Sequence, residues 1–131
     1  MNPDVSINTE IIFKLYNIAD QIDRLGIISP KESNEKTTIL NENREDFIEV
    51  DYIKGFVMLI NNFNCKSSNY FDENFFLYLE NYDFCKRLRS KNENIYIVPK
   101  SKIHHLGGEA VDRKYHYEIE LSRNWHWMWS K

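Results

Sequence analysis

The chain has 131 residues, 42% of them hydrophobic and 15% aromatic, which is enough for one domain with a modest core and excludes a disordered chain. Its formal net charge is -3, from 17 basic and 20 acidic residues scattered along the sequence, so nucleic acid is not expected as a partner. Cys65 and Cys85 form no metal or disulfide pattern, which favours a reducing compartment. With no apolar spanning stretch and no signal region after Met1, we expect a cytoplasmic protein.

The spacing of apolar residues in the first third of the chain predicts a helix over residues 8–22. A short buried strand is predicted over residues 25–29, and Pro30 is expected to end it. Residues 31–46 are polar and predict a long surface excursion, with a small hairpin around residues 37–39.

The rest of the chain predicts strands over residues 50–60 and 92–99, a further strand over 102–105, and a helix over 112–131. The aromatic end of that helix has two readings. It could meet a membrane or a partner, or it could be a packing helix that lacks the rest of its protein, which we favour.

Four small clusters could carry chemistry, and Asn2-Pro3-Asp4 is the first of them. Oxygen ligands at alternate positions of an extended turn point the same way, so Asp4 could hold a hard divalent cation that bridges to a diphosphate. A plain turn has the same sequence and is the commoner reading.

The second cluster contains Glu80, Asp83 and Arg87. If a helix begins near Glu80, these side chains share one face, Asp83 and Arg87 can pair, and the acidic groups lie in the first turn. Capping and one ion pair would explain this cluster. Alternatively, one carboxylate is a general base, and aromatic neighbours such as Phe76 and Tyr78 limit water.

The third cluster is His104-His105 with the glycines that follow it, and the fourth is the aromatic tail described above. Neighbouring strand residues face opposite ways, so at most one of the two histidines can address a given site. A neutral imidazole there could complete a metal shell or bond a phosphate oxygen. A solvated loop histidine is the alternative.

Taken in order, these clusters resemble the second half of a family 2 glycosyltransferase of the GT-A fold, in particular the rhamnosyltransferase-like enzymes. The match runs from Asn2 to about Asn124. Its motifs are Asn-Pro-Asp at residues 2–4, Gly-Ile-Ile-Ser-Pro-Lys at 26–31, Gly-x-x-Met-Leu-Ile at 55–60, Phe-Asp-Glu-x-Phe-Phe-x-Tyr at 71–78, the acidic helix start at Glu80, and His-x-Gly-Gly at 105–108.

The resemblance implies an α/β fold in a single domain of residues 1–131. It would be an incomplete GT-A-like mixed sheet flanked by helices, lacking the amino-terminal βαβ half that binds the nucleotide. Such a sheet would expose an edge. We therefore expect either a homo-oligomer or a partner that supplies the missing half.

The resemblance also implies roles for individual residues at a metal and diphosphate site. Asp4 would be the metal-binding carboxylate of an Asp-x-Asp-like motif, with Asn2 in the place of its first member. His105 would lie near the metal and the diphosphate, and His104 is the alternative because the register is ambiguous by one residue. The expected metal is manganese or magnesium.

A catalytic base and an acceptor pocket are implied in the same way. Asn81 stands where the family has an acidic residue, and an amide cannot be a base at neutral pH, so the role falls to Glu80 or Asp83. The residues expected to border the acceptor are Gly55, Phe76, Tyr78 and Arg87.

The implied function is an inverting, metal-dependent transfer of a sugar from a nucleotide-diphospho-sugar to a hydroxyl group. The acceptor would be a saccharide or a lipid-linked molecule, in surface polysaccharide or glycolipid synthesis at the inner face of the membrane. The alternative is a catalytically silent binding or assembly module of the same fold, which Asn81 and the missing half favour.

Overall fold

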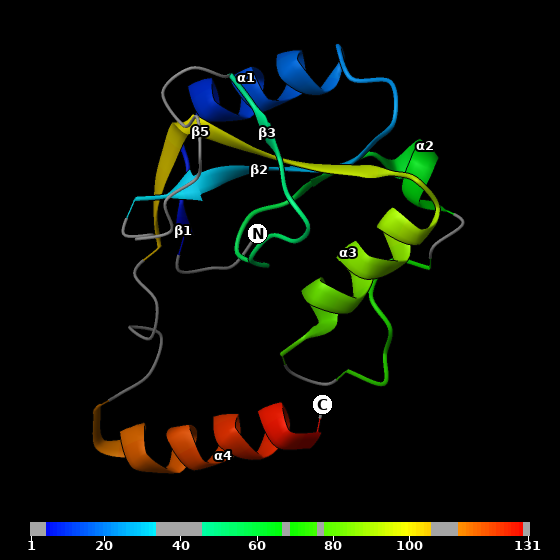
Figure 1. The fold of residues 1–131 in the computed structure, drawn as a ribbon. Helices are drawn as coiled ribbons and strands as arrows, with labels where there is room; N and C mark the ends of the chain where they lie inside the picture. The colour runs from blue at the N-terminus through cyan, green and yellow to red at the C-terminus, as the bar shows by residue number, and fades with distance from the viewer. Residues whose placement is uncertain (1–4, 34–45, 67–68, 76–77, 106–112, 130–131) are drawn as a thin grey trace.

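The computed structural model describes residues 5–33, 46–66, 69–75, 78–105 and 113–129. Five strands form one mixed sheet, in which β2 and β4 lie on one side of β5 and β1 and β3 pair with its other side (Figure 1). The strands are β1 (Val5–Ser6), β2 (Leu25–Glu32), β3 (Ile48–Glu49), β4 (Leu59–Ile60) and β5 (Asn94–His105).

Helices flank this sheet, which confirms the expected α/β class (Figure 1). Helix α1 covers one face and helix α3 the opposite face, and the short α2 lies at the start of β2. The helices are α1 (Thr9–Ala19), α2 (Asn62–Cys65), α3 (Glu80–Ser90) and α4 (His116–Trp129), and a 3-10 turn, η2 (Arg113–Tyr115), precedes α4.

Alternate side chains of the two central strands fill two cores, one on each face. Ile27 and Ile95 pack against the α3 side with Phe84, which is fully buried. Ile28 and Val98 pack against the α1 side. Because both faces are covered, β2 and the start of β5 are almost continuously apolar, as expected for parallel strands between helices.

Strands β2 and β5 are longer than the sequence predicts. Pro30 does not end β2, because the strand runs on to Glu32. The strands predicted over residues 92–99 and 102–105 are one strand. The parallel pairing steps from Pro30–Val98 to Lys31–Lys102, so an irregularity in β5 absorbs Pro99 without ending the strand.

The strand predicted over residues 50–60 is wrong for most of its length. Only Leu59–Ile60 is a strand, and β3 ends before it. We call residues 50–58 the Gly55 loop. The Val50 N–H at its start donates to the Ile95 carbonyl of β5 at 2.9 Å. Further along, side chains hold its backbone: Ser29 Oγ donates to the Val57 carbonyl at 2.8 Å, and Asn81 Nδ2 donates to the Ile53 carbonyl at 2.6 Å.

The helices predicted over residues 8–22 and 112–131 are confirmed with shorter bounds, as α1 and α4. Helix α1 begins after Asn8, whose side chain accepts a hydrogen bond from the Ile11 N–H at 2.8 Å, and it ends at Ala19. The excursion predicted over residues 31–46, with its hairpin, lies largely outside the described residues.

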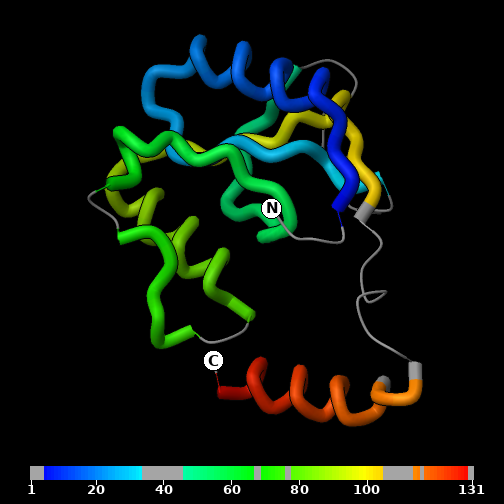
Figure 2. The backbone as a smooth tube through the Cα atoms, turned by 180° about the vertical axis from the view of Figure 1, so that it is seen from behind, coloured from blue at the N-terminus to red at the C-terminus, as the bar shows by residue number. Residues whose placement is uncertain are grey.

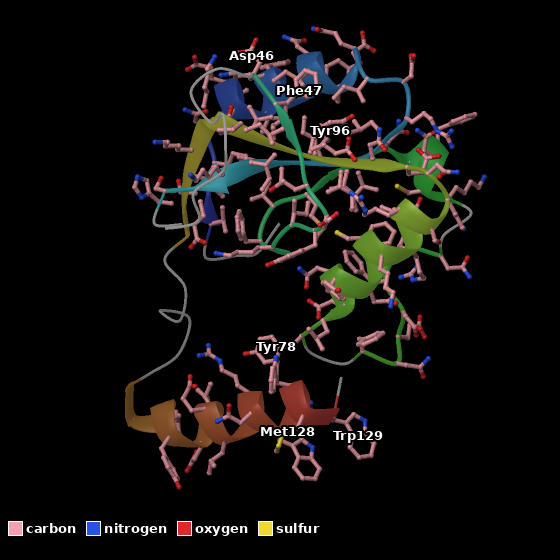
Figure 3. All side chains as sticks on the ribbon, viewed as in Figure 1. Asp46, Phe47, Tyr78, Tyr96, Met128 and Trp129 are labelled. Carbon is pink, nitrogen blue, oxygen red and sulfur yellow. The ribbon has the colours of Figure 1, made fainter. Side chains whose placement is uncertain are left out.

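Helix α4 lies apart from the sheet, beyond the start of α3, in both views (Figures 1 and 2). Tyr117, Trp125 and Trp129 are more than half exposed, and Trp125 and Trp129 stack with ring centroids 6.3 Å apart. Figure 3 shows Met128 and Trp129 at the end of this helix. No helix in the described part of the chain is long and apolar enough to cross a membrane.

Candidate functional site

The acidic helix start predicted near Glu80 is confirmed, since Glu80 is the first residue of α3. The two residues that immediately precede it, Tyr78 and Leu79, have φ angles of 66° and 65°. Neither is glycine, and the left-handed region costs such residues free energy. This turn fixes where the Glu80 side chain leaves the helix, against the sheet side of α3.

The Gly55 loop packs directly against this helix start. A Cβ atom placed on Gly55 would lie 3.6 Å from Asn81 Cβ and 4.0 Å from Glu80 Oε1. Gly55 and Glu80 are 25 positions apart in sequence but are neighbours in the fold. The structure therefore brings the expected acceptor residue next to one of the two candidate bases.

The Glu80 carboxylate is unusual in its environment. Its Oε2 atom is buried, and no hydrogen-bond donor among the described residues meets it. A buried carboxylate oxygen without a donor costs free energy, so such an atom in a folded protein calls for an explanation. The other oxygen, Oε1, faces Gly55, where a Cβ atom would lie 4.0 Å from it. A carboxylate oxygen without a donor retains the lone pair that a proton acceptor uses.

Asp83, the other candidate base, has a partner. Its Oδ2 accepts a hydrogen bond from Arg87 Nε at 2.7 Å, which confirms the predicted ion pair. Arg87 also donates to the Tyr70 carbonyl and lies over the Phe84 ring, 5.4 Å from its centroid. Asp83 is therefore engaged by Arg87, which also holds the Tyr70 backbone, whereas Glu80 Oε2 has no donor among the described residues.

Of the two aromatic residues expected to border the acceptor, one lies within the described part of the chain. Tyr78 is half-buried at the turn before α3 and is drawn between α3 and α4 in Figure 3. Phe76 lies outside the described residues. Tyr78 and Gly55 thus flank the helix start, while Arg87 lies two turns further along α3.

Of the expected metal and diphosphate residues, the two histidines lie at the end of β5, where it pairs with β1. Val5 and His105 are antiparallel partners in β1 and β5, and Ser6 is paired with His104. His104 is exposed. Asn2 and Asp4 lie outside the described residues, but Asp4 is bonded to Val5, which is the partner of His105.

A small core cluster connects these two halves of the candidate site. Val5 packs with Phe56, Val57 and Ile103, and all four are buried. Phe56 is the residue after Gly55. The residue after Asp4 and the residue after Gly55 therefore belong to the same core cluster, and Gly55 itself lies beside Glu80.

The side chain of His105, like Asp4, lies outside the described part of the chain. Among the described residues, no group of three or more histidine, cysteine, aspartate or glutamate side chains could hold a metal ion. Carboxylate oxygen with imidazole nitrogen is a donor set that suits manganese and tolerates magnesium.

Sequence reasoning missed one contact of this site. From the sequence, Asn81 is only a residue that cannot act as a base. In the fold its side chain donates a hydrogen bond to the Ile53 carbonyl. The two residues are 28 positions apart, and Ile53 lies in a loop that the sequence predicts as a strand. No local signal could have paired them.

No protein-family model matches the chain, and no solved structure matches it. It is similar to the low-salt glycan biosynthesis hexosyltransferase Agl10 of Haloferax volcanii, with 31% identity over 115 aligned residues. The alignment covers 72% of this chain and 37% of Agl10, so the chain corresponds to little more than a third of that protein's length.

Proposed function

We propose that this chain is the metal-site and acceptor-side portion of a glycosyltransferase of family 2 and the GT-A fold. It would transfer a sugar, with inversion, from a nucleotide-diphospho-sugar to a hydroxyl group of a saccharide or lipid-linked acceptor. Similarity to a glycan biosynthesis hexosyltransferase supports the reaction class. The motif order supports the finer assignment, including a role in surface polysaccharide or glycolipid synthesis at the inner face of the membrane.

One observation carries the proposal. Val5, the residue after Asp4, pairs with His105 and shares a core cluster with Phe56, the residue after Gly55, and this arrangement supports the proposal. In a transferase the distance between the diphosphate site and the base is about the length of one sugar ring, because the acceptor oxygen and the leaving oxygen flank the same carbon.

In this proposal Glu80 is the base. As the acceptor oxygen forms its bond to the anomeric carbon, the hydroxyl proton passes to the Glu80 carboxylate. The bond from that carbon to the diphosphate oxygen breaks, and its electron pair leaves on the diphosphate. Glu80 is preferred to Asp83 because one of its oxygens is unpaired, whereas Asp83 is engaged by Arg87.

Asp4 and His105 would hold a divalent metal, with Asn2 and His104 beside them. A bound manganese or magnesium ion would supply positive charge against the departing diphosphate. The role of the chain's own residues is to orient the donor and to keep the Glu80 carboxylate open to the acceptor.

The test is a titration of the full chain with Mn²⁺, alone and with uridine or guanosine diphosphate, followed by electron paramagnetic resonance. Asp4→Ala should abolish the nucleotide-dependent Mn²⁺ binding. Asp23→Ala, an exposed carboxylate after α1, is the matched control and should bind as the parent does. Equal binding by Asp4→Ala and the parent would contradict the proposal.

The second candidate is a catalytically silent binding or assembly module. Asn81 favours it, since its amide replaces an acidic residue and is bonded to the backbone. A silent module predicts that Glu80→Gln leaves every binding property unchanged and raises stability, because a buried charged oxygen without a partner is removed. A transferase predicts the same gain in stability together with loss of transfer when the donor-binding portion is present.

A further inference from the structure

The Asn81 side chain donates a hydrogen bond to the Gly55 loop, which faces Glu80. Its Nδ2 atom donates to the Ile53 carbonyl at 2.6 Å, and Ile53 is 2% exposed. The backbone of Ile53 also hydrogen-bonds the Cys85 thiol. Asn81 and Cys85 are one helical turn apart, so α3 holds Ile53 at two points of the same face.

This contact is one of several side-chain bonds that fix the Gly55 loop. Arg89 donates to the Val50 carbonyl at 3.2 Å, and Ser29 donates to the Val57 carbonyl at 2.8 Å. The bonds of Asn81 and Ser29 thus hold the backbone two residues before and two residues after Gly55. Of the two, the Asn81 bond comes from α3, which also bears Glu80.

An amide is the group that this geometry requires. The Ile53 carbonyl only accepts hydrogen bonds, and an ionised aspartate at position 81 would turn an acceptor oxygen toward it. The buried carbonyl would then lose its donor and face a negative charge, so the loop would move away from α3. Asparagine at this position thus suits a loop that is held close.

We propose that Asn81 is a positioning residue: its amide fixes the Gly55 loop over the start of α3 and so sets the space between Gly55 and the Glu80 carboxylate. This inference rests on the proposed function, in which that space receives the acceptor hydroxyl. The family resemblance implies an acidic residue at position 81. In this proposal the asparagine there anchors the loop, and Glu80 is the base.

The test compares Asn81→Ala and Asn81→Asp with Asn17→Ala, an exposed asparagine on α1, in the full chain. Amide hydrogen exchange should accelerate at least tenfold at residues 53–56 in both Asn81 variants and stay at the parent rate in Asn17→Ala. The side-chain carboxyl ¹³C signal of Glu80, assigned with Glu80→Gln, should move in Asn81→Ala because the group is rehydrated. Asn81→Gln retains a donor and should restore part of both signals.

Two results would overturn the inference. One is an unchanged exchange rate at residues 53–56 in folded Asn81→Ala. The other is faster exchange with an unmoved Glu80 carboxyl signal, which would make Asn81 a structural clamp without influence on the site. Neither readout uses a metal or a nucleotide, so both are separable from failure of the Mn²⁺ titration of Asp4→Ala, which would contradict the proposed function alone.

Discussion

Val5 and His105 face each other as antiparallel partners, although they stand 100 positions apart near opposite ends of the chain. The pairing joins β1 to the last two residues of β5, after β5 has bent away from β2. Because Val5 also belongs to the core cluster of Phe56 and Val57, the same cluster connects this end of the sheet to the Gly55 loop. The candidate site is therefore a property of the tertiary fold and not of any one motif.

The two described glycines, Gly55 and Gly26, should respond differently to substitution by alanine. In Gly55→Ala the new Cβ meets Asn81 at an ordinary 3.6 Å, so the free energy of unfolding should change by less than about 0.5 kcal/mol. In Gly26→Ala it meets the Asn94 carbonyl oxygen at 3.3 Å and Leu88 at 3.2 Å, which should cost about 1–3 kcal/mol.

Chemical denaturation of both variants measures these differences. With the donor-binding portion supplied, Gly55→Ala should also weaken acceptor use, since its methyl group enters the space beside Glu80. A strongly destabilised Gly55→Ala would contradict the contact geometry, and full acceptor use would contradict the place assigned to the acceptor.

Arg87 and Asp83 should contribute unequally to stability. Asp83→Asn removes a part-buried ion pair between residues four apart on a helix and should cost about 0.3–0.5 kcal/mol. Arg87→Ala also removes the bond to the Tyr70 carbonyl and the contact with the Phe84 ring, so about 1–2 kcal/mol is expected. Equal losses in thermal or urea unfolding would show that Arg87 acts only through Asp83.

The two thiols should be inert in the folded protein. Burial raises the pKa of Cys65 from 9.0 to about 11, and burial also raises the pKa of Cys85. A thiol whose pKa is raised by folding stabilises the fold fully below the unfolded value, and this stabilisation is lost as the pH rises from 9.0 toward about 11.

Reaction with a thiol reagent at pH 8 should therefore follow unfolding, and the urea midpoint should fall between pH 9 and 11. Cys65→Ser is not a suitable control, because the buried Sγ atom lies 3.3 Å from the Gly26 carbonyl and the volume changes. Cys65→Ala with Cys85 retained separates the two thiols. Rapid labelling of the native protein would contradict their burial.

The sequence predicts the helices and the two central strands well, because each has a strong local signal. Helix α1 has an Asn8 cap and a 3.6-residue apolar stripe, and α3 begins at the acidic residue expected to open it. Proline misled the strand bounds: Pro30 and Pro99 look like strand ends, but both lie at an irregularity that the paired strands accommodate.

The Gly55 loop and the candidate site were harder to predict for a different reason. Residues 50–58 are rich in side chains that favour strands, yet their backbone is bonded by Ser29 and Asn81, which are distant in sequence. The motifs identified Gly55 and Glu80 as site residues, but only the fold shows that they touch and that Asp83 is already paired. Local patterns contain no information on such pairings.

The most direct test of the central claim is a two-dimensional amide NMR titration of the labelled chain with Mg²⁺ and a nucleotide diphosphate. The account predicts shifts at Val5, Phe56 and Glu80 together, and their loss in Asp4→Ala. Shifts confined to one of these three places, or shifts that persist without the Asp4 carboxylate, would contradict a single site shared by the metal end and the start of α3.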